Sequence, residues 1–261
     1  MKKKIVVLSI VTYNSKHIFT ILDNLKKEFL NSSFLRIMIF DNCSDKAYQE
    51  KLSKYADFVE LHFHDKNEGF GFGHNYNLLN AEEPFFLIFN PDVIMNRISL
   101  ENMLMLIQDN PQAGLVVPKV LNSDGTTQYL IRNKVSVFDY ALRFIPIKLI
   151  KQFFDNRLAI YECRQLPDDT ISKVRIGSGC CMLLRGNAFK EIHGFDNQYF
   201  MYFEDYDLCL ELEKRNYEVL YTPFVEITHF YEKGAHKNFK LFKIFMQSMR
   251  KFFNKWGWRF F

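Results

Sequence analysis

The chain has 261 residues, 48% of them hydrophobic, and a formal net charge of +4 at pH 7, the composition of a folded protein that can bury a full core. Its five cysteines lack paired C-x-x-C spacing, which excludes a disulfide framework and a cysteine zinc site and favours a reducing cytoplasm. No apolar run approaches the ~18 residues that a membrane-spanning helix needs.

The first 120 residues alternate short apolar runs with intervals of helical pattern. The runs predict strands at 5–11, 36–40, 58–63, 85–89 and 114–117. The intervals predict helices at 16–29, 48–55, 75–81 and 99–109. Such alternation is typical of an α/β fold with a mostly parallel, Rossmann-like central sheet and helices on both faces.

Polar residues follow several of these predicted strands. Thr12, Tyr13 and Asn14 follow the first strand, Asp41 follows the second, and a turn from Asn90 to Asp92 follows the fourth. Ligands of parallel sheets bind beyond the carboxyl ends of the strands. We therefore expect these side chains to line one crevice. Taken alone, each group also suits an ordinary turn or helix cap.

A glycine-rich segment follows the third predicted strand and opens onto a helix. It runs from Asn67 to Asn75 and includes Gly71 and Gly73. Glycine lets the backbone approach a bound group closely, and a helix N-terminus favours an anion such as phosphate. The segment lacks the lysine of a P-loop, so it predicts a nucleotide contact of another kind.

Beyond residue 118 the alternation ends. Residues 138–161 predict an aromatic and basic helical segment that covers a site or touches a membrane, and residues 177–184 predict a turn into a buried strand, followed by a helix at 187–192. Glu204, Asp205 and Asp207 then begin an amphipathic helix among aromatic residues. Acids also stabilise the first turn of a helix, so this cluster alone leaves structural and catalytic roles open.

In this order, the segments resemble an inverting family 2 glycosyltransferase of the GT-A type, and most closely the rhamnosyltransferase branch. The resemblance implies a GT-A domain over residues 1–235, with a nucleotide-sugar half at 1–120 and an acceptor half at 121–235. It is carried by residues 12–14, 40–44, 67–75, 90–93, 178–182, 194–196, 202–209 and 229.

The family resemblance implies a role for each acid of the later segment. Asp205 matches the general base that takes the acceptor proton, a contribution of roughly 10²- to 10⁴-fold. Glu204 is expected to orient the acceptor or the base. Asp207 projects from the helix on the side of Glu204, about 100° away from Asp205, and is expected to be structural.

The resemblance also implies how the donor is held. Asp92 matches the metal-binding acid of the D-x-D motif, in which Asn90 replaces the first acid, and His229 is its expected partner in binding Mg²⁺ or Mn²⁺. Asp41 is expected to accept from a pyrimidine N–H, which suits UDP and dTDP equally. The loop at 12–14 lies beside base and ribose, and Asn67, Gly71, Gly73 and Asn75 complete the nucleotide-sugar site.

The basic charge is concentrated at the C-terminus. Residues 237–261 contain seven Lys or Arg and no acid. From Phe242 to Trp256 apolar residues recur along one helical face, with basic residues opposite. This pattern predicts an amphipathic tail over 236–261 that binds an anionic membrane surface, with core packing as the alternative. Nucleic acid is a weaker candidate, because the aromatic residues form a continuous face.

The favoured function is transfer of L-rhamnose from dTDP-L-rhamnose to a lipid-linked saccharide acceptor in bacterial cell-surface polysaccharide synthesis. The expected location is the cytoplasmic face of the cell membrane. Alternatives are a UDP-sugar donor, a sugar nucleotidyltransferase, and a non-catalytic binding protein. A nucleotidyltransferase would carry a basic, glycine-rich loop after the first strand, where Thr12, Tyr13 and Asn14 stand instead.

Overall fold

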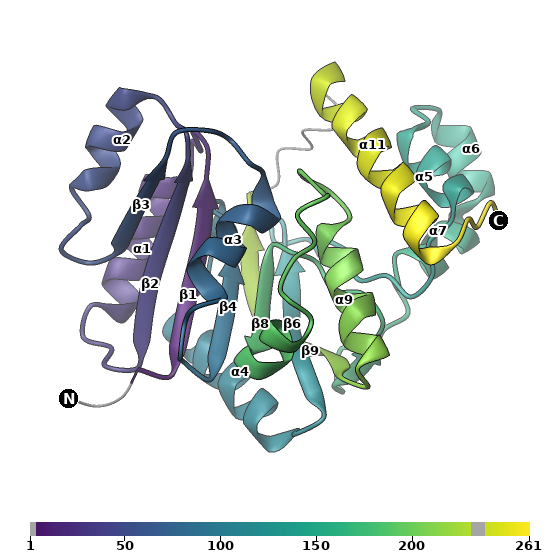
Figure 1. Ribbon diagram of the computed structural model, residues 1–261. Helices are drawn as coiled ribbons and strands as arrows, with labels where there is room; N and C mark the ends of the chain where they lie inside the picture. The colour runs from purple at the N-terminus through teal and green to yellow at the C-terminus, as the bar shows by residue number, and fades with distance from the viewer. Residues whose placement is uncertain (1–3, 231–237) are drawn as a thin grey trace.

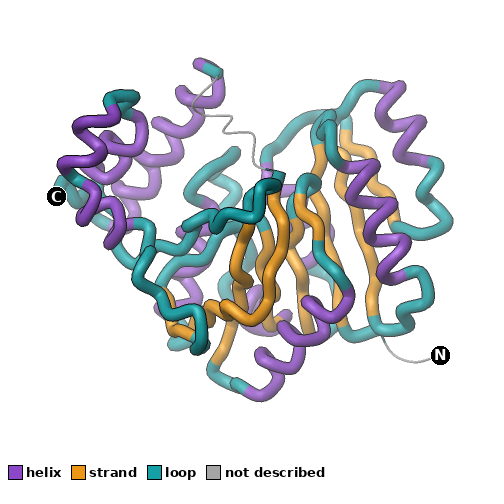
Figure 2. The backbone as a smooth tube through the Cα atoms, turned by 180° about the vertical axis from the view of Figure 1, so that it is seen from behind, coloured by secondary structure: helices purple, strands orange, loops and turns teal. Residues whose placement is uncertain are grey.

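The structure, a computed structural model, describes residues 4–230 and 238–261, and its centre is one sheet. The strands are β1 (Val6–Thr12), β2 (Leu35–Asn42), β3 (Glu60–His64), β4 (Phe85–Phe89), β5 (Val93–Ile94), β6 (Ala113–Leu121), β7 (Ser172–Val174), β8 (Cys181–Arg185) and β9 (Glu218–His229). They are ordered β3-β2-β1-β4-β8-β6-β9-β5, and β7 also pairs with β9. Figure 2 shows this sheet from behind.

Helices cover both faces of the sheet. They are α1 (Ile18–Phe29), α2 (Lys46–Ser53), α3 (Phe70–Leu78), α4 (Arg97–Asp109), α5 (Val137–Phe144), α6 (Lys148–Phe153), α7 (Asp155–Tyr161), α8 (Gly186–Glu191), α9 (Glu204–Lys214) and α11 (Phe239–Trp256). One core holds buried residues of α1, α2 and α4, and the other holds those of α3, α8, α9 and α11. The predicted α/β fold, with helices on both faces of a central sheet, is confirmed.

The direction of the strands changes across the sheet. The run β3-β2-β1-β4 is parallel, as predicted, and so is the pair β6 and β9. Strand β8 lies antiparallel between β4 and β6, because it begins beside the end of β4, where the Asn90 N–H donates to Cys180 O at 2.9 Å. This reversal brings the turn at 177–180 to the polar end of β4.

A group of helices stands beside one end of the sheet. Figure 1 shows α5, α6 and α7 next to α11, with α9 between this group and the strands. α5 begins with a capping box in which Ser136 and Asp139 bond to each other's backbone N–H. The sequence prediction of a helical segment over 138–161 is therefore borne out, divided into three short helices.

The apolar stripe of α11 packs against the protein. Phe245, Met249, Phe252 and Phe253 are buried, and the Phe252 and Phe203 rings lie 5.3 Å apart. This packing corrects the reasoning behind the predicted membrane tail, because the face expected to enter lipid is covered by α5 and α9. Core packing, the alternative, accounts for the stripe, since a helical apolar face is buried equally well by protein.

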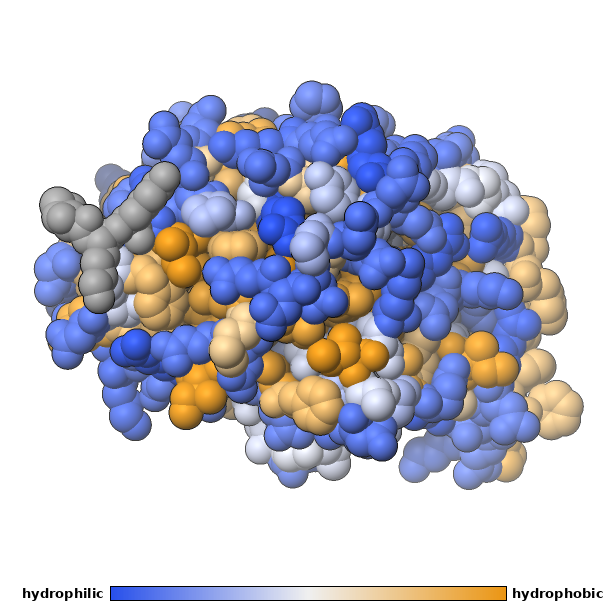
Figure 3. All heavy atoms as spheres, turned by 90° about the horizontal axis from the view of Figure 1, so that it is seen from below, coloured by the Kyte–Doolittle hydropathy of each residue, from blue (hydrophilic) through white to orange (hydrophobic). Residues whose placement is uncertain are grey.

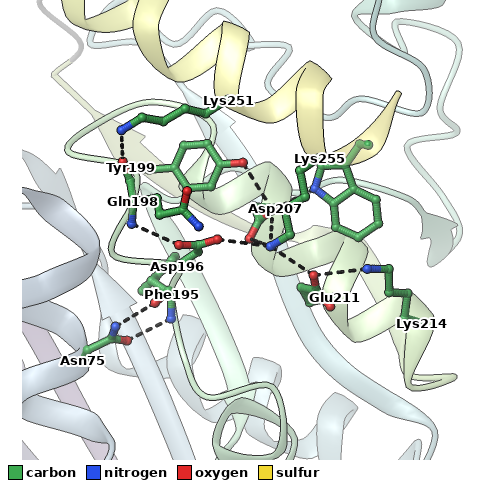
Figure 4. A network of polar contacts seen from close by, with 11 residues as sticks. Asn75, Phe195, Asp196, Gln198, Tyr199, Asp207, Glu211, Lys214, Lys251 and Lys255 are labelled. Carbon is green, nitrogen blue, oxygen red and sulfur yellow. Dashed lines mark hydrogen bonds and ion pairs between the residues drawn. The ribbon is translucent and has the colours of Figure 1, made fainter. Parts of the chain in front are cut away.

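Polar contacts hold the end of α11 in place (Figure 4). Lys255 Nζ lies 2.9 Å from the Asp207 carboxylate, and the Trp256 indole N–H donates to Asp207 Oδ1 at 2.7 Å. Tyr199 O–H donates to the same carboxylate oxygen at 3.4 Å. Asp207 is thus a buried anchor for α11, in line with its expected structural role.

The sequence predicted two boundaries within the chain. The predicted boundary between domain and tail, at 235 and 236, lies outside the described residues. The proposed division at 120 and 121 stays a prediction. Within 4–230 and 238–261, no helix is long and apolar enough to cross a bilayer.

The packing of α11 predicts a loss of stability when its apolar face is truncated. Phe252→Ala should lower the free energy of unfolding by about 3–5 kcal/mol, because a buried ring is replaced by a cavity. Phe239→Ala, in the same helix but 82% exposed, is the matched control and should change it by less than about 0.5 kcal/mol. Denaturant unfolding measures both; equal, small effects would show that α11 is not part of the core.

Candidate functional site

One cavity brings together the predicted catalytic and metal-binding residues. It has a volume of about 370 Å³ and lies between the polar ends of β4 and β9 and the start of α9. Asn90 and Asp92 come from the turn after β4, His229 ends β9, and Glu204 and Asp205 begin α9. Five predicted site residues, from three separate segments of the chain, thus line the same cavity.

The backbone before α9 turns its acids toward the cavity. Tyr202 and Phe203 have φ angles of 71° and 70°, in the left-handed region that bulky residues rarely adopt. Such strain persists where surrounding packing fixes it, and it concentrates at functional sites. Here the Phe203 ring is buried against Tyr140 and Phe245, at 5.1 and 5.2 Å between ring centroids.

Asp205 is held by two backbone donors. The Gly179 N–H donates to Oδ2 at 2.9 Å, and the Tyr206 N–H donates to Oδ1 at 2.9 Å. Burial raises the pKa of Asp205 to about 6, although these hydrogen bonds oppose the rise. A carboxylate in this range is ionised at neutral pH and basic enough to accept a proton, which suits a general base.

Glu204 differs from its neighbour. Its side chain is buried, and Oε2 has no hydrogen-bond partner in the described part of the chain. Burial, followed by the charge of Asp205, raises the pKa of Glu204 well above its usual range. The two adjacent carboxyls titrate as a coupled pair, in which burial favours the protonated form of Glu204. In that form Glu204 is a hydrogen-bond donor next to Asp205.

Asp92 and His229 form the second polar centre of the cavity. Asp92 Oδ1 lies 3.3 Å from His229 Nε2. Gln128 fixes the imidazole: its amide nitrogen donates to His229 O at 2.8 Å, and its Oε1 lies 3.0 Å from Nδ1. The hydrogen of a neutral imidazole is therefore on Nδ1, and the Nε2 lone pair faces the carboxylate.

This pair fits a divalent cation. Asp92 Oδ1 and Asn90 Oδ1 are buried and accept no hydrogen bond from the described residues. Carboxylate and amide oxygens with a neutral imidazole are competent ligands for Mn²⁺, and the oxygens suit Mg²⁺. Residues 4–230 and 238–261 hold no cluster of three His, Cys, Asp or Glu placed for a metal. A cation here would need further oxygens from a ligand or water.

The expected base-binding residues lie at the ends of the two neighbouring parallel strands. Thr12 pairs with Asp41 in the ladder, and Tyr13 is exposed. Asp41 Oδ1 accepts from Ser44 N–H and Gln49 Nε2, at 3.0 and 2.7 Å, while the buried Oδ2 has no partner among described residues. Asp41 therefore caps the next turn and still offers one acceptor.

The loops that follow β1 and β3 are also held by hydrogen bonds. Asn14 has a φ of 49°, its N–H donates to Ser44 Oγ at 2.8 Å, and its Oδ1 accepts from the Asp45 N–H at 3.0 Å. Asn67 Oδ1 accepts from Gly69 N–H at 3.1 Å, so Asn67 shapes the loop before α3. These local bonds leave the predicted donor contacts of Asn14 and Asn67 untested.

Gly71, Gly73 and Asn75 have packing roles in the structure, and their predicted place in the nucleotide-sugar site stays a prediction. A Cβ at Gly73 would lie 2.7 Å from a Val11 methyl, and one at Gly71 would lie 2.7 Å from Phe195 Cβ. The Asn75 amide bonds both to the N–H and to the carbonyl of Phe195, at 2.8 Å each (Figure 4). These residues seat α3 against the sheet.

Other residues of the cavity wall had no signal in the sequence. Arg132 is buried there, with its guanidinium 4.3 Å from the Tyr161 ring, and its Nη1 donates to the carbonyls of Tyr129 and Ile131. Its charge lowers the pKa of Asp205, against the larger effect of burial. Tyr140 and Tyr206 also line the cavity. Arg132 and Tyr140 are isolated in the sequence, so no local motif marks them, whereas Tyr206 lies within the segment 202–209 but has no predicted role.

Comparison with known proteins gives consistent results. The model of Glycosyl transferase family 2 matches residues 8–192. The chain is 25% identical to rhamnosyltransferase WbbL of Escherichia coli (strain K12), over 82% of this chain and 78% of that protein. It is 28% identical to N-acetylglucosaminyl-diphospho-decaprenol L-rhamnosyltransferase of Mycobacterium tuberculosis (strain ATCC 25618 / H37Rv), over 74% of this chain and 66% of that protein.

Solved structures share the fold at low sequence identity. GalNAc-T7 with UDP, GalNAc and Mn²⁺ superimposes with a TM-score of 0.66 at 14% identity, over 94% of this chain and 47% of that one. Mannosyltransferase PcManGT of Pyrobaculum calidifontis, with GDP-Man and Mn²⁺, gives 0.64 at 16% identity, over 97% and 65%. The fold is thus that of GT-A glycosyltransferases, and the chain belongs to Glycosyl transferase family 2 and is a glycosyltransferase.

Proposed function

We propose that the protein is an inverting, metal-assisted glycosyltransferase that moves L-rhamnose from dTDP-L-rhamnose to a hydroxyl of a lipid-linked saccharide. The observation that carries this proposal is the pairing, in one cavity, of a base near its working pKa with an acid–imidazole pair suited to a cation. An acceptor and a diphosphate can then meet between the two centres.

Asp205 is the proposed general base. The acceptor O–H proton passes to a carboxylate oxygen of Asp205 while the acceptor oxygen bonds to the anomeric carbon of the donor. On the opposite face, the bond from that carbon to the diphosphate oxygen breaks, so the anomeric configuration inverts and the nucleoside diphosphate leaves. The Gly179 and Tyr206 N–H groups hold the base in position throughout.

Glu204 and the metal ligands support the two ends of this displacement. The protonated carboxyl of Glu204 can donate a hydrogen bond to an acceptor oxygen and so orient it. Asp92 and His229, with Asn90 as an additional oxygen, would hold Mg²⁺ or Mn²⁺. When bound, such an ion supplies positive charge that stabilises the departing diphosphate.

The donor preference rests on relatives, and base recognition rests on Asp41. Both curated relatives are named as rhamnosyltransferases, and the mycobacterial one acts on a decaprenol-linked diphosphosugar. The partner-free Asp41 Oδ2 can accept from the ring N–H of thymine or uracil. A UDP-sugar is therefore the alternative donor. A lipid-linked acceptor would place the protein at the cytoplasmic membrane surface during bacterial polysaccharide synthesis.

The role of Asp205 is tested by substitution and by pH. Asp205→Asn should retain donor binding but lose at least about 100-fold in kcat/KM, because the amide cannot take the proton. In the unaltered protein, kcat/KM should fall about tenfold per unit as pH drops below about 6, because the base becomes protonated. Asp65→Asn, at an exposed acid, is the control; near-normal turnover of Asp205→Asn excludes this base.

The role of Gln128 is tested through metal affinity. Gln128→Leu should weaken Mn²⁺ binding about 10- to 100-fold, because His229 loses the acceptor that orients its ring. Gln128→Glu keeps an acceptor and should bind more tightly than the leucine variant. Electron paramagnetic resonance of free Mn²⁺, with dTDP present to supply diphosphate oxygens, measures both. Unchanged affinity in Gln128→Leu would exclude orientation of His229 by Gln128.

The donor is identified with a panel of dTDP- and UDP-sugars, assayed for binding and for slow hydrolysis. We expect dTDP-L-rhamnose to bind most tightly, and Asp41→Asn to weaken dTDP- and UDP-sugars alike, because both bases present the same N–H. Isothermal titration calorimetry gives the affinities. If a UDP-sugar binds more tightly, it replaces dTDP-L-rhamnose as the proposed donor. If Asp41→Asn leaves binding unchanged, Asp41 does not contact the base.

A further inference from the structure

A surface of α6 stands out because it is apolar and uncovered. None of the residues of this six-residue helix is buried. Leu149 and Phe153, four residues apart and therefore on one side of the helix, are 76% and 83% exposed. A helix this short is not stable alone in water. Large apolar side chains grouped on a surface mark a binding face.

Aromatic contacts join α6 to the C-terminal segment. Phe153 packs on Phe154, Phe154 on Phe138, and Phe138 stacks on Phe261, with centroid separations of 5.0, 5.2 and 4.5 Å. The Phe138 N–H donates to Phe260 O at 3.2 Å. We call Leu149, Phe153 and Phe261 the α6 patch. Figure 3 shows apolar side chains at the right-hand edge, the side on which Figure 1 places α6 and the C-terminus.

The charge around the α6 patch is positive. Lys148 is the first residue of α6, and Arg259 stands two residues before Phe261; both are exposed, and neither has an ion pair with a described residue. The two acids of residues 134–161 are neutralised: Asp139 pairs with Arg157 at 2.7 Å, and Asp155 with Arg164 at 2.8 Å. Apolar side chains flanked by unpaired cations suit a surface that is apolar inside and anionic outside.

The α6 patch and the cavity belong to the same helical group. Arg143 and Phe144, at the end of α5, line the cavity, and α6 begins four residues later at Lys148. A saccharide whose lipid remains in the bilayer must reach the cavity from the membrane surface. Docking through α6 would bring that surface to the acceptor side of the site; this link to the acceptor rests on the proposed function.

We propose that the α6 patch docks the protein on an anionic lipid membrane, with Leu149 and Phe153 inserted at the headgroup boundary and Lys148 and Arg259 contacting lipid phosphates. This surface replaces the aromatic stripe of α11, which is buried in protein. The lipid is recognised by its negative headgroup and its apolar interior, and a second copy of the chain is the competing occupant.

The test is flotation of the full chain with vesicles of phosphatidylcholine, with and without phosphatidylglycerol. The unaltered protein should bind the anionic vesicles more tightly. Leu149→Ser with Phe153→Ser should weaken that binding by roughly tenfold or more, because apolar area stays in water. Ile98→Ser with Met105→Ser, which removes exposed apolar residues from α4, is the matched control and should bind like the unaltered chain.

Charge is tested separately. Lys148→Glu with Arg259→Glu should remove most of the preference for phosphatidylglycerol, since each basic residue near such a surface contributes about 1 kcal/mol. Absence of vesicle binding by the unaltered chain, or equal binding by the Leu149 and Phe153 variant, overturns the proposal. The proposal is also overturned if the unaltered chain binds no vesicles but forms a dimer, measured by light scattering, that the Leu149 and Phe153 variant loses. The α6 patch would then bind a second copy of the chain.

The vesicle result and the proposed reaction can fail independently. Donor hydrolysis in the absence of vesicles should be unchanged in the Leu149 and Phe153 variant, because neither residue lines the cavity. Loss of hydrolysis in this folded variant would overturn the assignment of these residues to docking alone. Vesicle binding by a chain that transfers no sugar would leave the α6 patch in place and reject the proposed function.

Discussion

Burial of the Asp205 carboxylate is the constraint on which the rest of the site depends. Removing a charge from water is costly unless hydrogen bonds compensate, and here two backbone N–H groups supply them. One comes from the turn before β8, so the antiparallel insertion of β8 beside β4 is required for the base to be held. The close approach also favours glycine at 179, where a Cβ would lie 3.3 Å from Asp205 Cβ, a tight contact.

A second acid on the same helix, Asp207, joins α9 to α11. Burial raises the pKa of Asp207, and the hydrogen bonds from Lys255 and Trp256 of α11 oppose the rise by stabilising the charged form. Since Asp205 and Asp207 lie within one turn of α9, the position of the base is coupled mechanically to the packing of α11. The C-terminal helix is therefore part of the support of the cavity, which explains why its apolar face is buried.

Site residues could be predicted most readily where they belong to short sequence motifs. Asp92 and Asp205, which the structure places in one cavity, could be predicted as neighbours because acids after a strand and at a helix start stand in recognisable local order. The parallel half of the sheet follows from apolar periodicity. The nucleotide contacts predicted for Gly71 and Gly73 stay predictions, because a missing side chain serves close packing, which the structure shows here, as well as ligand approach. Arg132 and Gln128 were missed, since only the folded chain brings them beside Asp205 and His229. The reversal of β8 depends on long-range pairing that no local pattern encodes.

The C-terminal helix shows why charge must be read together with its partners. In sequence, Lys255 of α11 is unopposed, because the acids that pair with it, Asp196, Asp207 and Glu211, all lie earlier in the chain. In the fold, Lys255 contacts Asp196, Asp207 and Glu211, at 3.2, 2.9 and 3.0 Å, so this charge is used inside the protein. Around α6 the acids pair with arginines, and Lys148 is exposed without an ion pair among the described residues. An attraction to anionic lipid therefore belongs to the surface where apolar groups and unpaired cations coincide in space, which is α6.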